Sequence, residues 1–183
     1  MGRPKYLLEI GGRTFLECCL DALHGVVDRI VVSIAAGQAV PTLDSSVLIV
    51  EDKEPEGGPL VGLASAVPAA GAIHSVVLSC DAPLIKQGLI ELLFDAIGSN
   101  DAALPTAFGK EQFFPAAYYS SVGEIARRLL KRNERRMSAL AAECNCSVVA
   151  ESRVLEMDPN LESFFNVNAP SDYEALVRRF ENV

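Results

Sequence analysis

The feature that most constrains this chain is its regular alternation between short apolar runs and longer amphipathic segments. The apolar runs have the length and β-branched content of strands, and they lie at residues 29–34, 47–50, 75–80, 102–105, 114–119 and 147–149. Helical periodicity recurs between them, at residues 15–23, 58–70, 86–97, 124–131, 137–143 and 170–180. This order predicts an α/β fold whose mostly parallel sheet is covered on both faces. No linker divides residues 1–183, so we expect a single domain.

Two helix boundaries carry clear local signals. Thr14 is a good N-cap for the helix over residues 15–23, which should end at Gly25. Pro170 suits the first turn of the last helix, and Asp172 is an acidic residue near its N-terminus. Both helices can therefore be placed from local sequence.

The charge of the chain excludes two classes of partner. The formal net charge is −8, whereas a surface for nucleic acid or an anionic membrane needs a basic face. Residues 57–80 contain no Asp, Glu, Lys or Arg, a length that raises the question of a membrane span. Pro59, Pro68 and His74 interrupt this stretch, so we interpret it as a buried helix followed by a buried strand. We expect no nucleic acid and no membrane among the partners.

The cysteines and the N-terminal residues favour the cytoplasm. The chain has five cysteines and two histidines, but no Cys-x-x-Cys pair, so a zinc site is not expected. An odd number of unpaired thiols fits a reducing compartment. The N-terminus becomes charged at once and lacks the apolar region of a signal peptide.

Asp81 is the strongest candidate for chemistry that the residues themselves indicate. It directly follows an apolar strand and precedes Ala82-Pro83, at the strand end where open parallel sheets bind ligands. A carboxylate there can hold Mg²⁺ against phosphate oxygens. It can equally be an ordinary helix N-cap, and the spacing leaves both readings open. The adjacent Cys80 is expected in the core.

Three weaker signals lie at other predicted strand and helix ends. Glu51 and Asp52 end a strand and could meet a base or ribose, although a solvated turn is the commoner role. The glycine-rich stretch 57–62 begins a helix where backbone could approach a ligand, as it could in any tight turn. Asn166 and Asn168 precede the last helix, where Asn often serves as a plain cap.

Taken together and in order, several segments resemble one family. They are Gly2-Arg3-Pro4-Lys5-x-Leu7-Leu8, Gly58-Pro59-Leu60-x-Gly62-Leu63, Cys80-Asp81-x-Pro83, Asn133-Glu134-Arg135-Arg136 and Phe165-Asn166-Val167-Asn168-x-Pro170. These segments are similar to those of the molybdenum cofactor guanylyltransferases, the MobA-like nucleotidyltransferases. The resemblance runs from Met1 to the final helix. It implies a three-layer, Rossmann-like nucleotidyltransferase fold.

The resemblance also implies a reaction, in which the terminal phosphate of molybdopterin attacks the α-phosphate of Mg·GTP and pyrophosphate leaves. Such a displacement needs charge neutralisation and in-line positioning more than a protein nucleophile. By this similarity Lys5 contacts the triphosphate, Asp81 binds Mg²⁺, and Asp52 helps to hold the guanine nucleotide. Asn168, and after it Asn166, would line the reacting phosphates.

Further residues follow from the same resemblance. Gly58 is carried over as a nucleotide-binding position, and so is Ser33, which stands where the family often has a polar amide. Arg135 and Arg136 are suited to an anionic pterin phosphate, because guanidinium groups match phosphate oxygens; an exposed helix end is the equal alternative. Molybdoenzymes or molybdopterin-handling proteins are candidate partners.

The start of the chain departs from the family pattern. The family begins with an apolar strand, a Leu-Ala-Gly-Gly loop and an arginine, and this sequence opens at the Gly-Arg-Pro-Lys segment that follows them. We therefore expect the first strand of the sheet to be missing, and GTP binding by the chain as given to be weak, because backbone donors of that loop hold the phosphate. A cytidylyltransferase of the same pathway, and a non-catalytic relic that binds molybdopterin or a partner protein, remain alternatives.

Overall fold

The computed structural model describes residues 3–52, 54 and 57–181, so Gly2 of the first family-like segment lies outside the described residues. In chain order the elements are η1 (Lys5–Leu7), β1 (Glu9–Ile10), β2 (Arg13–Thr14), α1 (Phe15–Leu23), β3 (Ile30–Ile34), β4 (Val47–Glu51), α2 (Pro59–Ala70), β5 (His74–Val77), α3 (Gln87–Ile97), β6 (Ala102–Ala107), β7 (Lys110–Glu111), β8 (Ala116–Tyr119), α4 (Val122–Lys131), α5 (Met137–Ala142), β9 (Cys146–Val149), α6 (Glu151–Met157), η2 (Glu162–Phe164) and α7 (Pro170–Glu181).

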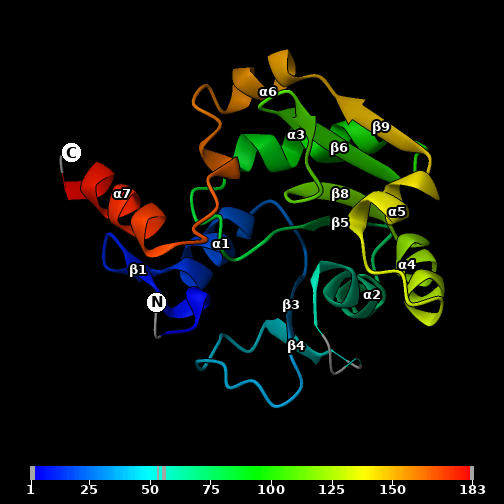
Figure 1. Ribbon diagram of the computed structural model, residues 1–183, viewed down its shortest axis with the longest axis horizontal. Coiled ribbons are helices and arrows are strands. Elements are labelled where there is room, and N and C mark those ends of the chain that lie inside the picture. The colour runs from blue at the N-terminus through cyan, green and yellow to red at the C-terminus, as the bar shows by residue number, and fades with distance from the viewer. Residues whose placement is uncertain (1–2, 53, 55–56, 182–183) are drawn as a thin grey trace.

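The main sheet has five strands and is mixed. Its order is β5-β8-β6-β7, with β9 also paired to β6. β8 runs antiparallel to both β5 and β6, whereas β9 runs parallel to β6. The α/β class is as predicted, but the expectation of a mostly parallel sheet is wrong for this part. The cause is that the chain reverses through β7 after β6 and returns as β8 between β6 and β5 (Figure 1).

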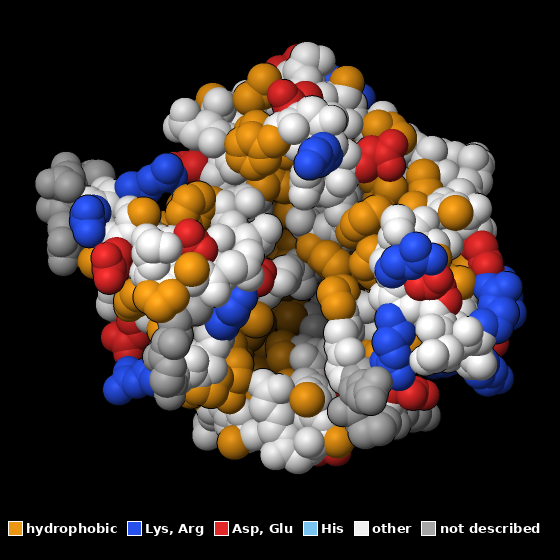
Figure 2. Space-filling view, viewed as in Figure 1, with side chains coloured by type: hydrophobic (Ala, Val, Ile, Leu, Met, Phe, Trp, Pro, Cys, Tyr) orange, Lys and Arg blue, Asp and Glu red, His pale blue; other side chains and the backbone are white. Residues whose placement is uncertain are grey.

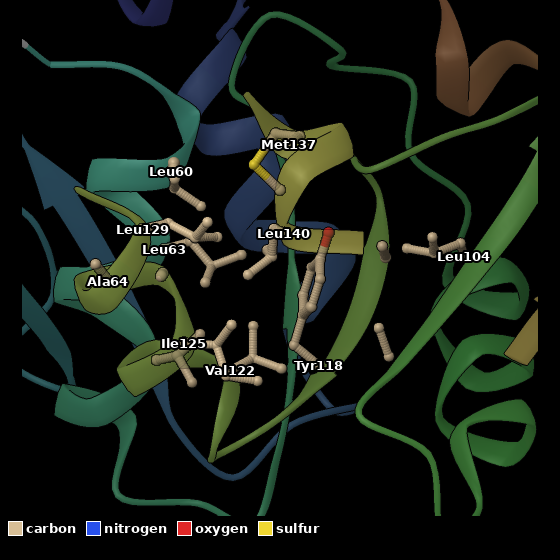
Figure 3. Close-up of a cluster of buried hydrophobic side chains, with 14 residues drawn as sticks. Leu60, Leu63, Ala64, Leu104, Tyr118, Val122, Ile125, Leu129, Met137 and Leu140 are labelled. Atoms are coloured by element: carbon tan, nitrogen blue, oxygen red, sulfur yellow. The ribbon is translucent and has the colours of Figure 1, made fainter. Parts of the chain in front are cut away.

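Alternating side chains of β6 and β8 face two separate cores. Ala102, Leu104, Ala116 and Tyr118 point to the side covered by α2, α4 and α5. Figure 3 shows that core, where Leu60 and Leu63 of α2 meet side chains of α4 and α5 around the Tyr118 ring. Ala103 and Ala117 point to the opposite side, which α3 and α6 cover. The layers are therefore helix, sheet, helix, as the two-sided burial of the strands requires.

A second, smaller sheet consists of β3 and β4, which pair in parallel with Ile30 opposite Val47. Within the described part of the chain, β3 and β5 belong to separate sheets. The four residues of β5 are all half-buried, and Cys80 beyond it is exposed. The buried strand expected over residues 75–80 is thus shorter and more exposed to solvent than predicted. The prediction that Cys80 lies in the core was wrong.

The two ends of the chain pack against each other. A small core joins Leu8 and Ile10 to Phe15 of α1 and to Val167 and Leu176 at the C-terminal end. The Tyr173 hydroxyl on α7 donates to the backbone oxygen of Glu9 at 2.8 Å. Figure 1 shows α7 beside β1 and α1. This packing brings the segment before α7 next to the segment that contains Lys5.

Two expectations about the environment of the chain can be compared with the structure. The uncharged stretch 57–80 forms α2 and β5, and among the described residues no helix has both the length and the apolar character needed to cross a membrane. All five cysteines are free thiols in the structure.

Candidate active site

Lys5, Asp81 and Asn168, three site candidates far apart in sequence, meet at one point. The Lys5 ammonium donates to Asp81 Oδ2 at 3.2 Å and to Asn168 Oδ1 at 2.7 Å. Lys5 opens η1, Asp81 follows β5, and Asn168 precedes α7. The side chains of Lys5 and Asp81 are 35% and 20% exposed, so solvent and small ligands can reach both.

Asp81 is held in place by its neighbours. The Ser79 hydroxyl donates to Asp81 Oδ1 at 2.5 Å. The backbone oxygen of Asp81 accepts from the Val167 amide at 2.8 Å, which ties the turn after β5 to the segment before α7. Each carboxylate oxygen of Asp81 therefore accepts a hydrogen bond, Oδ1 from Ser79 and Oδ2 from Lys5. Sequence reasoning missed Ser79, although its spacing of two residues from a candidate ligand was visible.

Asn168 is positioned by the start of α7. Asp172 accepts from the backbone amides of Asn168 at 2.9 Å and Ala169 at 2.7 Å. These hydrogen bonds, the one from Ala169 first, lower the pKa of Asp172. Asp172 thus acts as the acidic residue of an N-terminal helix cap, a role broader than the dipole effect predicted for it. Asn166 is exposed on the same segment, with buried Val167 between it and Asn168.

A second group of predicted residues lies between the small sheet and α2. The Ser33 hydroxyl of β3 donates to Asp52 Oδ1, directly after β4, at 2.5 Å. A Cβ atom added at Gly62 of α2 would lie 3.8 Å from Ser33 Oγ, so the helix passes close to this pair. Gly58 is the N-cap of α2, with φ of 137° and open space around its missing side chain. The contacts of the described residues link these positions to one another and not to Lys5.

The two arginines before α5 have different surroundings. The Arg136 guanidinium, 75% exposed, donates to Glu134 through Nε at 3.0 Å and Nη2 at 2.6 Å. This pairing is the main reason why the pKa of Glu134 falls to about 2. Arg135 Nη2 lies 3.9 Å from Oε2 of Glu54, and Glu54 belongs to the loop after β4. Arg135 thus lies near the loop that follows Asp52. Arg136 is paired with Glu134, a contact that the sequence did not reveal.

Figure 2 shows where an extended ligand could lie. The face in view is hollowed at its centre, between the part that carries β1 and α7 and the part that carries α2 and α4. A depression of about 540 Å³ is also present beside α4 and α5. Among its lining residues are Arg132, Glu134, Arg136 and Ser138. The depression beside α4 and α5 thus gives the Arg136 guanidinium a concave surface on which a ligand could bind.

The donor set at Asp81 limits the kind of metal site that is possible. Among residues 3–52, 54 and 57–181, no group of three or more His, Cys, Asp or Glu side chains could hold a metal ion. The oxygens of Asp81 and Asn168 are hard ligands of the type that Mg²⁺ prefers. A site with so few protein ligands fits Mg²⁺ that is completed by substrate phosphates and water.

Comparisons with known proteins identify a family and a fold. Residues 1–147 match the family described as the MobA-like NTP transferase domain. A probable molybdenum cofactor guanylyltransferase of Methanothermobacter thermautotrophicus is 31% identical over 94% of this chain and 90% of its own length. The protein of the same name from Haloferax mediterranei is 28% identical over 97% of this chain and 87% of its own.

A solved structure is similar over the whole fold. It is molybdopterin-guanine dinucleotide biosynthesis protein A of Archaeoglobus fulgidus, which superposes with a TM-score of 0.79 at 18% identity. The match covers 100% of this chain and 93% of that protein. The predicted three-layer nucleotidyltransferase fold is confirmed by this likeness.

Proposed function

Because the chain belongs to the family of MobA-like NTP transferase domains, we propose that it transfers GMP from Mg·GTP to molybdopterin and releases pyrophosphate. Two relatives that match over nearly the whole chain carry the name of that activity. The observation that carries the proposal is the meeting of the Lys5 ammonium with Asp81 Oδ2 and Asn168 Oδ1. A lysine and a carboxylate that can hold Mg²⁺ at one point can supply the positive charge that stabilises a transferring phosphoryl group.

In this reaction an oxygen of the terminal molybdopterin phosphate attacks the α-phosphorus of GTP. The bond from that phosphorus to the bridging oxygen breaks, and pyrophosphate leaves with the electron pair. Asp81 would hold Mg²⁺, which neutralises charge on the phosphate oxygens when it is bound. Lys5 would bind the triphosphate, and Asn168, with Asn166 beside it, would orient the reacting phosphates. No protein nucleophile is needed.

The remaining residues divide between the two substrates. Ser33, Asp52 and Gly58 are proposed to bind the guanosine part of GTP; Ser33 and Asp52 are hydrogen-bonded to each other near the ends of β3 and β4, and Gly58 is the N-cap of α2. Arg135 and Arg136 are proposed to bind the pterin phosphate, since guanidinium groups match phosphate oxygens. For Arg136 this requires the phosphate to share or replace the Glu134 carboxylate.

The test is the Asp81→Asn variant, assayed with molybdopterin, GTP and Mg²⁺ by chromatographic detection of the guanine dinucleotide. We expect turnover to fall by at least about 100-fold, in line with the loss of one electrostatic group in such sites. The matched control is Asp95→Asn, which removes an exposed carboxylate from α3 and should leave turnover unchanged.

Two outcomes would contradict the proposal. Near-normal turnover of Asp81→Asn with Mg²⁺ as the only metal would leave Asp81 as a structural residue of the turn after β5. It is not a helix cap, because the next helix, α3, has Lys86 as its N-cap. A cytosine dinucleotide formed from CTP faster than the guanine product from GTP would assign the chain to the cytidylyltransferase activity instead.

A further inference from the structure

The Lys5 ammonium lies where a metal ion would find its protein ligands. Its nitrogen donates to Asp81 Oδ2 at 3.2 Å and to Asn168 Oδ1 at 2.7 Å. Both are hard oxygens of the kind that a divalent cation prefers, and the remaining carboxylate oxygen, Asp81 Oδ1, already accepts from the Ser79 hydroxyl at 2.5 Å. In the structure, the Lys5 ammonium thus hydrogen-bonds both Asp81 Oδ2 and Asn168 Oδ1.

We propose that Lys5 and the divalent metal compete for Asp81 Oδ2, and that Lys5 must leave before the metal can bind. The inference rests on the proposed role of Asp81 as the metal ligand. Mg²⁺ binds oxygen at about 2.0–2.1 Å, so a metal on Oδ2 would lie close to an ammonium group bonded to the same atom. Two cations that share one oxygen repel each other strongly.

The structure indicates which partner moves. Asp81 is fixed by the Ser79 hydroxyl and by the Val167 amide, and the backbone of Asn168 is fixed by Asp172. The ammonium of Lys5 sits on a flexible four-carbon stem that is 35% exposed. The ligand oxygens are therefore held, and the lysine can swing away from them.

Nucleotide phosphates offer the Lys5 ammonium an alternative binding partner. A triphosphate at this site offers the ammonium several anionic oxygens, and the position on Asp81 Oδ2 becomes free for the metal. Binding of nucleotide and metal is then positively coupled through Lys5, and the coupling is reciprocal. Without nucleotide, the ammonium keeps the metal affinity low, so the site does not hold a metal before its substrate arrives.

The experiment measures Mn²⁺ binding without nucleotide, by calorimetry or by the loss of the free Mn²⁺ electron paramagnetic resonance signal. We expect Lys5→Gln to bind Mn²⁺ at least about tenfold more tightly than the unmodified chain, the ratio that loss of one charge-assisted hydrogen bond produces. Arg3→Gln removes an exposed positive charge two residues away and is the matched control. It should change the affinity less than about twofold, because exposed charges are screened by solvent and salt.

Salt separates direct competition from general charge repulsion. The Debye length falls to a few ångströms near 1 M ionic strength, so a gain caused only by relief of long-range repulsion between the lysine and Mn²⁺ would disappear there. The gain of Lys5→Gln should persist. If the gain is lost at high salt, or if Arg3→Gln shows the same gain, competition at Asp81 Oδ2 is wrong.

Asp81→Asn distinguishes this inference from the proposed function. It should weaken Mn²⁺ binding in every buffer. If it does, and Lys5→Gln binds Mn²⁺ no better than the unmodified chain, the exchange is refuted while the metal role of Asp81 stands. If Asp81→Asn binds Mn²⁺ normally, the metal role itself fails, and the exchange fails with it.

Discussion

Gly123 sets how closely α4 can approach α2, and its replacement by alanine should loosen this contact. A Cβ atom at this position would lie 2.7 Å from Pro68 Cγ and 2.9 Å from Pro68 Cδ, whereas carbon atoms pack at about 3.5–4.0 Å. The proline ring is part of α2 and cannot rotate away, so the helices must separate by about 0.8–1.3 Å. Overpacking of this kind costs about 1–3 kcal/mol.

The expected result includes a small opposing gain. Alanine is favoured over glycine in a helix by about 0.5–1 kcal/mol, so Gly123→Ala should lower the free energy of unfolding by about 0.5–2 kcal/mol. Gly88 is the matched control, because it is also the second residue of its helix and its added Cβ would meet the flexible Met157 sulfur at 3.3 Å. Gly88→Ala should therefore be neutral or stabilising.

Urea unfolding followed by circular dichroism gives both values by linear extrapolation. The reasoning is refuted if Gly123→Ala is as stable as Gly88→Ala, or more stable than the unmodified chain. A change in the spacing of these helices should also affect the candidate site, because Gly58 is the N-cap of α2 and the chain after α4 continues to Arg135. A looser contact between these helices should also raise the KM for GTP.

Three further results are expected. Ser79→Ala should weaken Mn²⁺ binding about 3- to 10-fold by removing the donor to Asp81 Oδ1; unchanged calorimetric affinity would contradict this. The pKa of Asp172 is lowered by the amides it accepts from, so its stabilising contact is present above the unfolded pKa near 3.9 and is lost as pH falls through the lower folded pKa. Hydrogen exchange, corrected for intrinsic rates, should show those amides protected at neutral pH and unprotected in Asp172→Ala, which has no acceptor oxygen, and equal protection would count against it. Burial raises the pKa of Cys19 to about 12, so iodoacetamide at neutral pH should modify it only after unfolding; labelling of the folded chain at the rate of a free thiol would be the opposite result.

Local sequence was enough to place most helices and strands. Thr14 caps α1 and exchanges hydrogen bonds with Glu17, as its position before the apolar helix face predicts. The runs that became β3 and β4 were recognisable because β-branched apolar residues favour extended backbone. α6 was missed because only Val154 of its seven residues is buried, so no apolar periodicity marks it.

The identities of several candidate residues were also readable from sequence. Asp81 ends a strand pattern, Asn168 precedes a proline that starts a helix, and Lys5 lies in a segment similar to one of the family. Sequence could name these residues because each stands at a recognisable boundary. Their chemical partners were not readable, because a local pattern carries no information about which boundaries meet in space.

Tertiary structure alone decided those partners. The packing of α7 on β1 and α1 brings Asn168 to Lys5, which is 163 positions away in the chain. The return of β8 between β5 and β6 made the sheet mixed, since strand order depends on how all the apolar faces are buried at once. Side-chain type and local boundaries are local properties, whereas strand order and the juxtaposition of Lys5 with Asp81 are products of the whole core.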